Sequence, residues 1–366
     1  MSTICHVVRQ FLPSVGGLES YVENLALELM RQGHDCDILT LDRLFRRPGE
    51  RLAPGDEVHG LRVMRVPMVG HRRLFTPIFS REALKPYDVV HVHGIDGMFD
   101  RVALEPRRAG QALIATTHGA FFHTPWMRTA KHIYFNIITR ATAQRYDAII
   151  ATSSADWRLM NHLRRGVTHI PNGVAPLQCN AQGRNLLSHG RLASHKRLDL
   201  VIAALTDPAL KDVELHIVGP EWDVSIGALQ AYAFAKCISH RVHIHGGVSA
   251  ERLNEIAADC GVFVCASEYE GFGMALVEAF SAGLSAVVAK NASFTEIMQH
   301  SPVGKLADFH EAAAVAQVIR DELDQITPAK RTAAQGYAGH FSWRRNAERT
   351  VEVYEDARRR LLLQAA

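Results

Sequence analysis

The stretch VFVCASEYEGFGMALVEA, residues 262–279, passes from a short apolar run through a loop with two glycines into an amphipathic helical pattern. The run Val262–Cys265 has the length and composition of a buried strand. Gly271 and Gly273 allow a ligand to approach the backbone N–H groups at the helix start, where unpaired donors and the helix dipole favour a phosphate. The stretch therefore predicts a strand–loop–helix unit of an α/β domain with an anion site at the helix N-terminus.

The same alternation of β-branched runs and helical patterns extends over most of the chain, and it is typical of parallel α/β architecture. The pattern is interrupted between Pro171 and Gly183 and becomes continuously helical from about Glu311. We therefore expect two doubly wound, Rossmann-like α/β domains that face a cleft, because ligands of open α/β sheets bind at the carboxyl ends of the strands. The predicted segments are a first domain at 1–170, a linker at 171–183, a second domain at 184–340, and a C-terminal helix with its tail at 341–366.

Individual elements follow from the same patterns. A helix is expected at 18–31 and another at 132–145, and Ser249 is expected to cap a helix over 250–259. The predicted strands are 4–8, 37–41, 88–93, 112–117 and 148–152 in the first half, and 185–189, 213–218, 242–245, 262–265 and 286–289 in the second.

The composition excludes several classes of protein. With 366 residues, 47% hydrophobic and 22% charged, the chain is too long for one core and too apolar for disorder. No apolar run approaches the length of a membrane-spanning helix, and the strand-like run from Ile4 leaves no room for a signal peptide. The six cysteines show no CxxC pair, which predicts buried, reduced thiols in a cytosolic protein and neither a disulfide scaffold nor a zinc finger.

The charge is unevenly distributed along the chain. Residues 1–180 carry 22 Lys/Arg against 16 Asp/Glu, whereas the remainder carries 19 against 22. A basic first half indicates an anionic partner, which could be nucleic acid, anionic lipid or a phosphorylated substrate, although uneven surface charge alone would give the same count.

Two carboxylates and two cations form the candidate site in the second half. Glu270 and Glu278 could accept hydrogen bonds from vicinal hydroxyls of a sugar or ribose, or they could be a helix N-terminal carboxylate and a solvated face position. Arg191 and Lys196 follow the predicted strand 185–189 and are five residues apart. They could grip a diphosphate, or they could be part of a solvated basic loop.

The order of these residues resembles that of a known family. The segment from Glu270 to Glu278 resembles the E-x7-E motif of retaining glycosyltransferases of family 4, which have the GT-B fold, and Gly190-Arg191 with Lys196 is similar to their G-R-x4-K motif. The resemblance implies that Arg191 and Lys196 bind the donor pyrophosphate, helped by the N–H groups of Phe272, Gly273 and Met274. It also implies that Glu270 holds the donor sugar and Glu278 the ribose. Arg197 falls outside the match and is expected at the surface.

The first half carries two further matches. Gly16 and Gly17 lie between the first strand and the first helix, where a tight turn alone would also require glycine. The resemblance implies that this G-G-x-E loop faces donor and acceptor. His118 ends a strand, and one histidine among 20 is usually structural, but the family match implies an active-site group that touches the transferred sugar. His91 and His93 form a His-x-His pair, for which we disfavour a metal because no carboxylate completes a ligand set.

A narrower resemblance concerns residues 7–19 and 269–294, which look like those of bacterial exopolysaccharide mannosyltransferases of the xanthan and acetan type. It implies transfer of mannose from GDP-mannose, with retention, to an oligosaccharide on polyprenyl diphosphate. His118 and Glu270 are then the catalytic residues, and neither a metal nor another cofactor is expected. The alternatives are a UDP-sugar donor, a soluble acceptor, an epimerase or phosphorylase of similar build, and a catalytically silent nucleotide-sugar-binding subunit.

The basic first half then suggests peripheral attachment to anionic lipid at the inner face of the cell membrane. Nucleic acid is disfavoured because the basic residues are dispersed and no recognition motif accompanies them. The residues expected to form this face are Arg43, Arg46, Arg47, Arg72, Arg73, Arg107 and Arg108, with Phe75, Phe121, Phe122 and Trp126 nearby in sequence.

Overall fold

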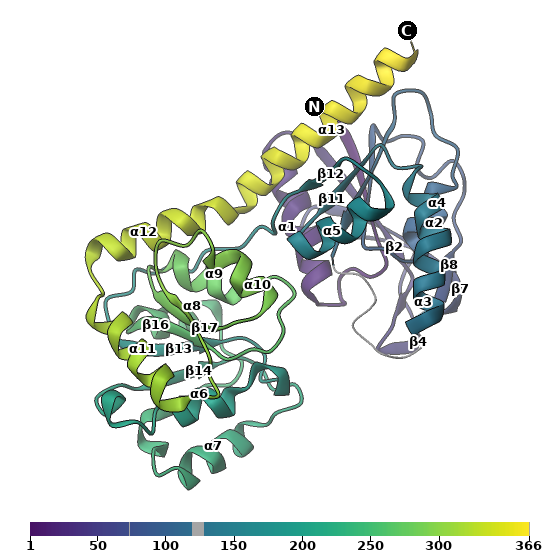
Figure 1. The fold of residues 1–366 in the computed structure, drawn as a ribbon. Helices are drawn as coiled ribbons and strands as arrows, with labels where there is room; N and C mark the ends of the chain where they lie inside the picture. Colours follow the sequence, from purple (N-terminus) through teal and green to yellow (C-terminus); the bar gives the residue numbers. More distant parts are fainter. Residues whose placement is uncertain (73, 119–127, 366) are drawn as a thin grey trace. The chain divides into compact units, whose positions relative to one another are not determined.

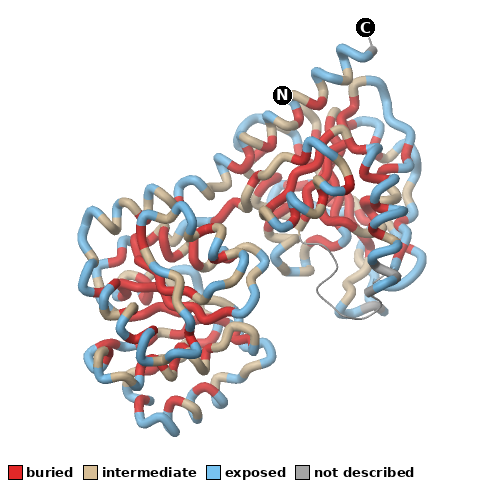
Figure 2. The backbone as a smooth tube through the Cα atoms, viewed as in Figure 1, coloured by how far each residue is buried: buried red, intermediate tan, exposed pale blue. Residues whose placement is uncertain are grey.

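The computed structural model describes residues 1–72, 74–118 and 128–365, and the chain divides into two compact units (Figure 1). The first unit consists of Met1–Gly173 together with Trp343–Ala366, and the second consists of Val174–Ser342. In each unit the buried residues concentrate in a central sheet and on the inner sides of its helices (Figure 2). The expectation of two α/β domains with a C-terminal helix is therefore confirmed.

The first unit contains an eight-stranded sheet that is parallel except where its last two strands meet. Its order is β12-β11-β10-β9-β1-β2-β6-β5, and only the β5–β6 pair in this sheet is antiparallel among the residues described. The strand order reverses between β1 and β9, which is the place where doubly wound sheets bind ligands. The strands are β1 (Thr3–Val8), β2 (Asp35–Leu41), β5 (Gly55–Val58), β6 (Leu61–Val66), β9 (Val89–His93), β10 (Ala112–Thr117), β11 (Ala148–Ala151) and β12 (Val167–His169).

Helices cover both faces of this sheet. Alternate residues of β1 separate the two cores: Ile4 and Val8 pack with α1 (Gly17–Arg31) and α13 (Trp343–Ala365), whereas Cys5 and Val7 pack on the opposite face. The helix predicted at 132–145 is present as three consecutive pieces, the middle one a π-helix. The opposite face is covered by α2 (Gly97–Ala103), α3 (Arg128–Tyr134), the π-helix Phe135–Thr139, α4 (Arg140–Ala143) and α5 (Ser154–Leu163).

Three β-hairpins in the first unit have no counterpart in the predicted elements, and one of them is the antiparallel pair β5–β6 of the main sheet. The other two are formed by β3 (Arg43–Leu44) with β4 (Arg47–Arg51), and by β7 (Met68–His71) with β8 (Leu74–Pro77). Their strands are two to five residues long. Runs of that length are too short to carry a recognisable alternation of apolar and polar residues.

The second unit contains a six-stranded, all-parallel sheet with the order β15-β14-β13-β16-β17-β18. The order reverses between β13 and β16, so the loops after these two strands are the expected place for a ligand. Ser249 accepts a hydrogen bond from Arg252 N and caps α8, as predicted. The strands are β13 (Asn185–His189), β14 (Leu215–Val218), β15 (Val242–Ile244), β16 (Cys260–Cys265), β17 (Ser285–Ala289) and β18 (Lys305–Ala307).

The helices of the second unit pack on both faces of its sheet. They are α6 (Leu198–Ala204), α7 (Ile226–Ala235), α8 (Ala250–Ala258), α9 (Met274–Ser281), α10 (Ala292–Met298), α11 (Ala312–Asp324) and α12 (Pro328–Ala338). Over the residues that the structure describes, no helix is both long and apolar enough to cross a membrane.

Candidate functional site

The loop after β13 begins with a close approach between two backbone segments. Gly190 follows β13 with φ 135°, and Gly219 follows β14 with φ 153°. A Cβ atom at Gly219 would lie 1.9 Å from the carbonyl oxygen of Gly190, so a side chain cannot be accommodated there. This contact fixes where the chain leaves β13 and therefore where Arg191 and Lys196 are presented.

Lys196 and Glu270 form an ion pair between the two loops at the strand-order reversal. Nζ of Lys196 lies 2.5 Å from Oε1 of Glu270, and the two side chains are 14% and 13% exposed. The loops are also joined through their backbones, since Glu268 N donates to His195 O at 2.9 Å. The sequence predicted roles for both residues but did not predict that they are partners.

Glu278 has a partner that the sequence analysis missed. It lies on α9, and its Oε2 is 2.8 Å from Nε2 of His189, the last residue of β13. The hydrogen bond fixes one carboxylate oxygen and leaves the other geometrically available to a ligand hydroxyl. The position of His189, directly before Gly190-Arg191, is the signal that could have identified it.

Arg191 lies against an aromatic ring. Its guanidinium carbon is 4.7 Å from the centroid of the Trp222 ring, and Trp222 is 53% exposed. The two loops are held together because Leu192 N donates to Pro220 O and Trp222 N donates to Leu192 O. A contact of this kind contributes about 0.5–1 kcal/mol at an exposed site and limits the orientation of the planar guanidinium.

The conformation of the loop before α9 depends on Gly273. Gly273 has φ 100°, and a Cβ there would lie 3.1 Å from Cε1 of Phe294, so this position favours glycine on two grounds. Ser293 Oγ donates to the carbonyl oxygen of Glu270 at 2.7 Å and holds the loop from the other side. The N–H groups at the start of α9, beginning near Phe272 and Met274, can therefore bind an anion.

Arg197 is more constrained than a surface residue. Its side chain is 26% exposed, and it pairs with Asp199 at 3.0 Å and with Glu268 at 2.8 Å. Its φ of 48° places it in the left-handed region. Arg197 was expected at the surface, and its partly exposed side chain also connects the Arg191–Lys196 loop to the loop after β16 through Glu268.

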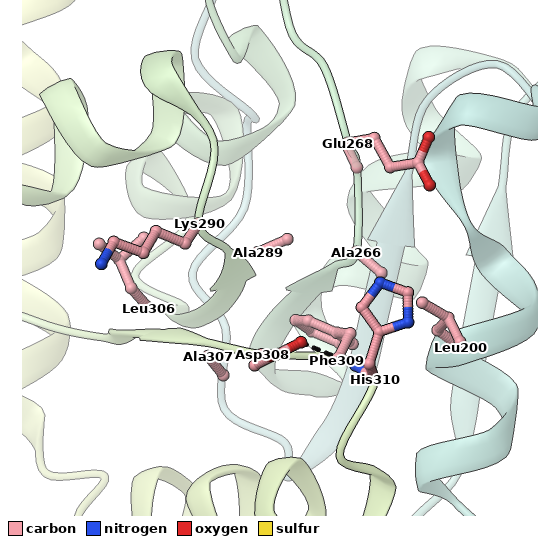
Figure 3. Close-up of a pocket in the computed structure, with 11 residues that line it drawn as sticks. Leu200, Ala266, Glu268, Ala289, Lys290, Leu306, Ala307, Asp308, Phe309 and His310 are labelled. Atoms are coloured by element: carbon pink, nitrogen blue, oxygen red, sulfur yellow. Dashed lines mark hydrogen bonds between the residues drawn. The ribbon is translucent and has the colours of Figure 1, made fainter.

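A pocket of about 340 Å³ lies beside this site, at the carboxyl ends of β16, β17 and β18 (Figure 3). Figure 3 shows the charged ends of Glu268 and Lys290 on opposite sides of it, and His310 N donates to Asp308 Oδ1 at 3.0 Å. Its lining is largely apolar, and it shares Ser267 and Glu268 with the loop that leads to Glu270. The apolar lining residues are Leu200, Ala266, Ala289, Leu306, Ala307 and Phe309.

The remaining predicted residues lie in the first unit. Gly16 and Gly17 form the start of α1, where Ser14 Oγ donates to Glu19 Oε1 at 3.3 Å. Neither glycine has a left-handed φ; a Cβ at Gly16 would lie 2.6 Å from Oε2 of Glu19, whereas a Cβ at Gly17 would meet nothing within 4 Å. His118 follows β10, and its ring lies edge-on to Tyr21 with the centroids 4.4 Å apart. Burial, followed by the nearby Arg9 charge, lowers the pKa of His118 to about 3.

His91 and His93 belong to a histidine cluster that includes His6. One ring nitrogen of each residue lies within 4.8 Å of the others, a spacing from which a metal site could be considered. However, His91 Nδ1 lies 2.6 Å from Tyr354 Oη and its Nε2 lies 2.6 Å from Thr116 Oγ1. Since both nitrogens of His91 bond to protein hydroxyls, the arrangement is that of a hydrogen-bonded cluster.

The face expected to rest on lipid is not one continuous surface. Phe75 is buried, and Arg107 and Arg108 pair with Asp147 and Asp88. These carboxylates precede β11 and β9, at the amino ends of the strands, whereas Arg43 follows β2 at its carboxyl end. The prediction was therefore wrong for Phe75, Arg107 and Arg108. The predicted residues Arg73, Phe121, Phe122 and Trp126 lie outside the described residues.

Both halves of the chain match known families. Residues 15–176 match the family described as Glycosyltransferase Family 4, and residues 175–339 match the family described as Glycosyl transferases group 1. The chain therefore belongs to glycosyltransferase family 4 and has the GT-B fold, which confirms the resemblance drawn from the two motifs.

Individual proteins are similar to this chain over nearly its whole length. Over 367 residues, covering 97% of each chain, the protein is 32% identical to the GDP-mannose:cellobiosyl-diphosphopolyprenol alpha-mannosyltransferase of Xanthomonas oryzae pv. oryzae. It is 33% identical over 375 residues to the protein of the same name from Komagataeibacter xylinus, covering 99% of this chain and 95% of that one. The solved structure of sucrose-phosphate synthase from Thermosynechococcus elongatus matches all of both chains with a TM-score of 0.71 at 18% identity, which supports the fold.

Proposed function

We propose that this glycosyltransferase moves mannose from GDP-mannose, with retention at the anomeric carbon, to an oligosaccharide carried on polyprenyl diphosphate. The names of its relatives, at 32% and 33% identity over nearly the whole chain, support this donor and this class of acceptor. The main structural support for a transferase is the set of cations and carboxylates at the strand-order reversal of the second unit, where Lys196 and Glu270 are paired.

The main chemical task of the site is to stabilise the nucleoside diphosphate as the glycosidic bond breaks. Arg191, held against Trp222, and Lys196 supply two positive charges, and the start of α9 supplies N–H donors. We propose no cofactor and no metal for this step, because these groups can neutralise the charge that develops on the leaving phosphate.

The carboxylates position the donor. Lys196 occupies Oε1 of Glu270, so Oε2 can accept from a sugar hydroxyl, and His189 similarly orients Glu278 toward the ribose. His118 contacts the transferred sugar near the reacting carbon. We assign no covalent nucleophile, and retention then follows from attack on the same face of the sugar as the departing diphosphate.

The donor is tested with a panel of nucleotide sugars, first by thermal stabilisation and then by transfer. A ligand at 100 times its dissociation constant adds about 2.7 kcal/mol to the stability of the folded state. We expect a shift with GDP-mannose and none with UDP-sugars, and Glu270→Ala should abolish transfer in a folded protein. A shift with a UDP-sugar alone would replace the donor, and binding without transfer to any acceptor would favour a catalytically silent subunit.

We also propose that the protein contacts anionic lipid through the hairpins β3–β4 and β7–β8 of the first unit. A hollow of about 400 Å³ lies between them, and its lining includes the exposed Arg72 together with Arg43, which is 26% exposed and whose Nε lies 3.6 Å from Asp42 Oδ1. Val69 and Leu74 on the second hairpin are 64% and 66% exposed, which adds apolar contact area beside the two cations. Each cation near an anionic surface contributes about 1 kcal/mol.

Co-sedimentation with vesicles tests this surface. Arg72→Glu should weaken binding to anionic vesicles by about tenfold or more, because it removes one favourable charge and adds an unfavourable one. Arg158→Glu is the matched control, since Arg158 is exposed on α5 at the other edge of the sheet. Equal effects of the two variants, or binding that ignores lipid charge, would contradict the proposal.

A further inference from the structure

Three imidazole rings are linked by hydrogen bonds in a row, which we call the histidine row, from the core of the first unit to the carboxyl end of its sheet. His6 Nδ1 lies 2.9 Å from His93 Nε2, and His93 Nδ1 lies 3.4 Å from His118 Nε2. His6 and His93 are on the adjacent strands β1 and β9, and both are fully buried. The histidine row ends at His118, the one histidine to which we assign a contact with substrate.

Burial keeps these rings neutral. It lowers the pKa of His6 to about 3, and it holds the pKa of His93 well below its ordinary value, with the neighbouring histidines adding to the effect. A neutral imidazole has one N–H donor and one acceptor nitrogen. Since His93 uses both of its nitrogens, the two hydrogen bonds must run in the same direction, and only two arrangements of the protons are consistent.

The nitrogen at the buried end of the histidine row distinguishes these two arrangements of protons. His6 Nε2 is buried, and no hydrogen-bond partner for it exists among the described residues. If the bonds ran from His118 toward His6, this nitrogen would carry a buried N–H group without an acceptor, which native proteins rarely tolerate. If they run from His6 toward His118, it carries only an unused lone pair. The second arrangement is therefore favoured.

We propose that His6 and His93 are positioning residues that hold His118 in the tautomer with its proton on Nδ1. His93 Nδ1–H then donates to His118 Nε2, and Nδ1 of His118 becomes the donor of the ring. A neutral donor can bind a hydroxyl oxygen of the transferred sugar without placing a positive charge beside the sugar ring, which becomes electron-deficient as the glycosidic bond breaks. The sugar contact rests on the proposed function, whereas the tautomer does not.

Two neighbouring contacts are consistent with this assignment. The edge-on contact with Tyr21 holds the plane of the His118 ring, and Tyr21 Oη itself donates to Asn346 Oδ1 at 3.3 Å. His91 packs against His93 with the ring centroids 4.1 Å apart, but its nitrogens bond to the hydroxyl groups of Tyr354 and Thr116 and not to the histidine row. His91 is therefore a matched control for loss of a buried imidazole.

The first measurement is ¹⁵N NMR of the histidine rings in the full protein without substrate. We expect His118 to show a protonated Nδ1 and an unprotonated Nε2, and His93→Phe to produce exchange between the two tautomers. His93→Asn should preserve the signal, because the amide nitrogen of asparagine replaces the Nδ1–H donor. A proton on Nε2 of His118 in the unchanged protein would overturn the proposal, and this result needs no variant to fold.

The second measurement is steady-state transfer. His93→Phe should lower kcat by more than about tenfold with little change in KM, because the contact strengthens in the transition state and adds little to substrate binding, and His93→Asn should recover most of the loss. His91→Phe should reduce thermal stability but keep both the tautomer and kcat. If the tautomer is as expected and kcat does not respond, the sugar contact is refuted while the tautomer stands. If the wild-type protein transferred sugar to no acceptor, the proposed function would be refuted while the tautomer assignment would stand.

Discussion

Replacement of Lys196 by methionine separates the structural and catalytic roles of its ion pair with Glu270. The pair is 2.5 Å apart with side chains 14% and 13% exposed, so it lies between a surface pair, worth about 0–1 kcal/mol, and a buried pair, whose disruption costs about 3–5 kcal/mol. We expect Lys196→Met to lower the free energy of unfolding by about 1–2 kcal/mol, and the thermal transition of the second unit by roughly 2–8 °C.

A double-mutant cycle measures the pairwise part of this effect. Glu270→Gln should destabilise by a similar amount, and the double variant should be little worse than either single variant, with a coupling energy of about 1 kcal/mol. The assay is calorimetric unfolding, and Lys211→Met is the control because Lys211 is an exposed lysine of the same unit.

Transfer activity provides the second readout. Removal of one preorganised group that stabilises developing charge typically lowers kcat by about 10²–10³. Lys196→Met should therefore lose far more activity than its loss of stability explains, whereas Lys211→Met should lose none. Strictly additive destabilisation in the cycle would refute the ion pair, and a kcat within about threefold of the unchanged protein would refute the role of Lys196 at the diphosphate.

Three other predictions follow from single features. Gly219→Ala should destabilise the protein by more than about 2 kcal/mol, because its Cβ would lie 1.9 Å from Gly190 O; an unchanged thermal transition would contradict this. The pKa of His6 is lowered to about 3 in the folded protein, whereas in the unfolded chain it is about 6.5. As the pH drops from 6.5 toward 3 the unfolded chain therefore binds a proton that the folded protein does not, and His6 lowers the free energy of unfolding by about 1.4 kcal/mol per pH unit. His6→Phe should make unfolding less dependent on pH over that range, and an unaltered slope would count against the assignment. Trp222→Ala should weaken nucleotide binding by about 0.5–1 kcal/mol through loss of the ring that orients Arg191, measured by calorimetric titration; full affinity would show that the contact is incidental.

Local patterns in the sequence predicted the elements whose physics is local. The strand–loop–helix unit around Gly273 could be predicted because the buried run, the small residues and the helical stripe are adjacent in the chain. The resemblance to the two family motifs also implied that Lys196 and Glu270 bind the same donor. Their direct contact could not be predicted, because it depends on the side-chain conformations of residues 74 positions apart.

Long-range pairing explains most of what was missed. His6 and His93 are 87 residues apart and meet only because β1 and β9 become neighbours in the sheet. The hairpins at 43–51 and 68–77 have strands of two to five residues, too short for periodicity to identify. Phe75 was placed on a surface by its basic neighbours in sequence, but it alternates with exposed residues along β8 and points into the core.

The return of α13 to the first unit affects the order in which the protein can be made. Tyr354 completes the hydrogen bonds of His91, and Asn346 accepts from Tyr21, yet both follow the whole second unit along the chain. At about 5–20 residues per second, roughly 10–35 s of translation separate Gly173 from Trp343. During that time the sheet face that α13 covers is exposed on the ribosome, so the second unit can fold before the first is complete.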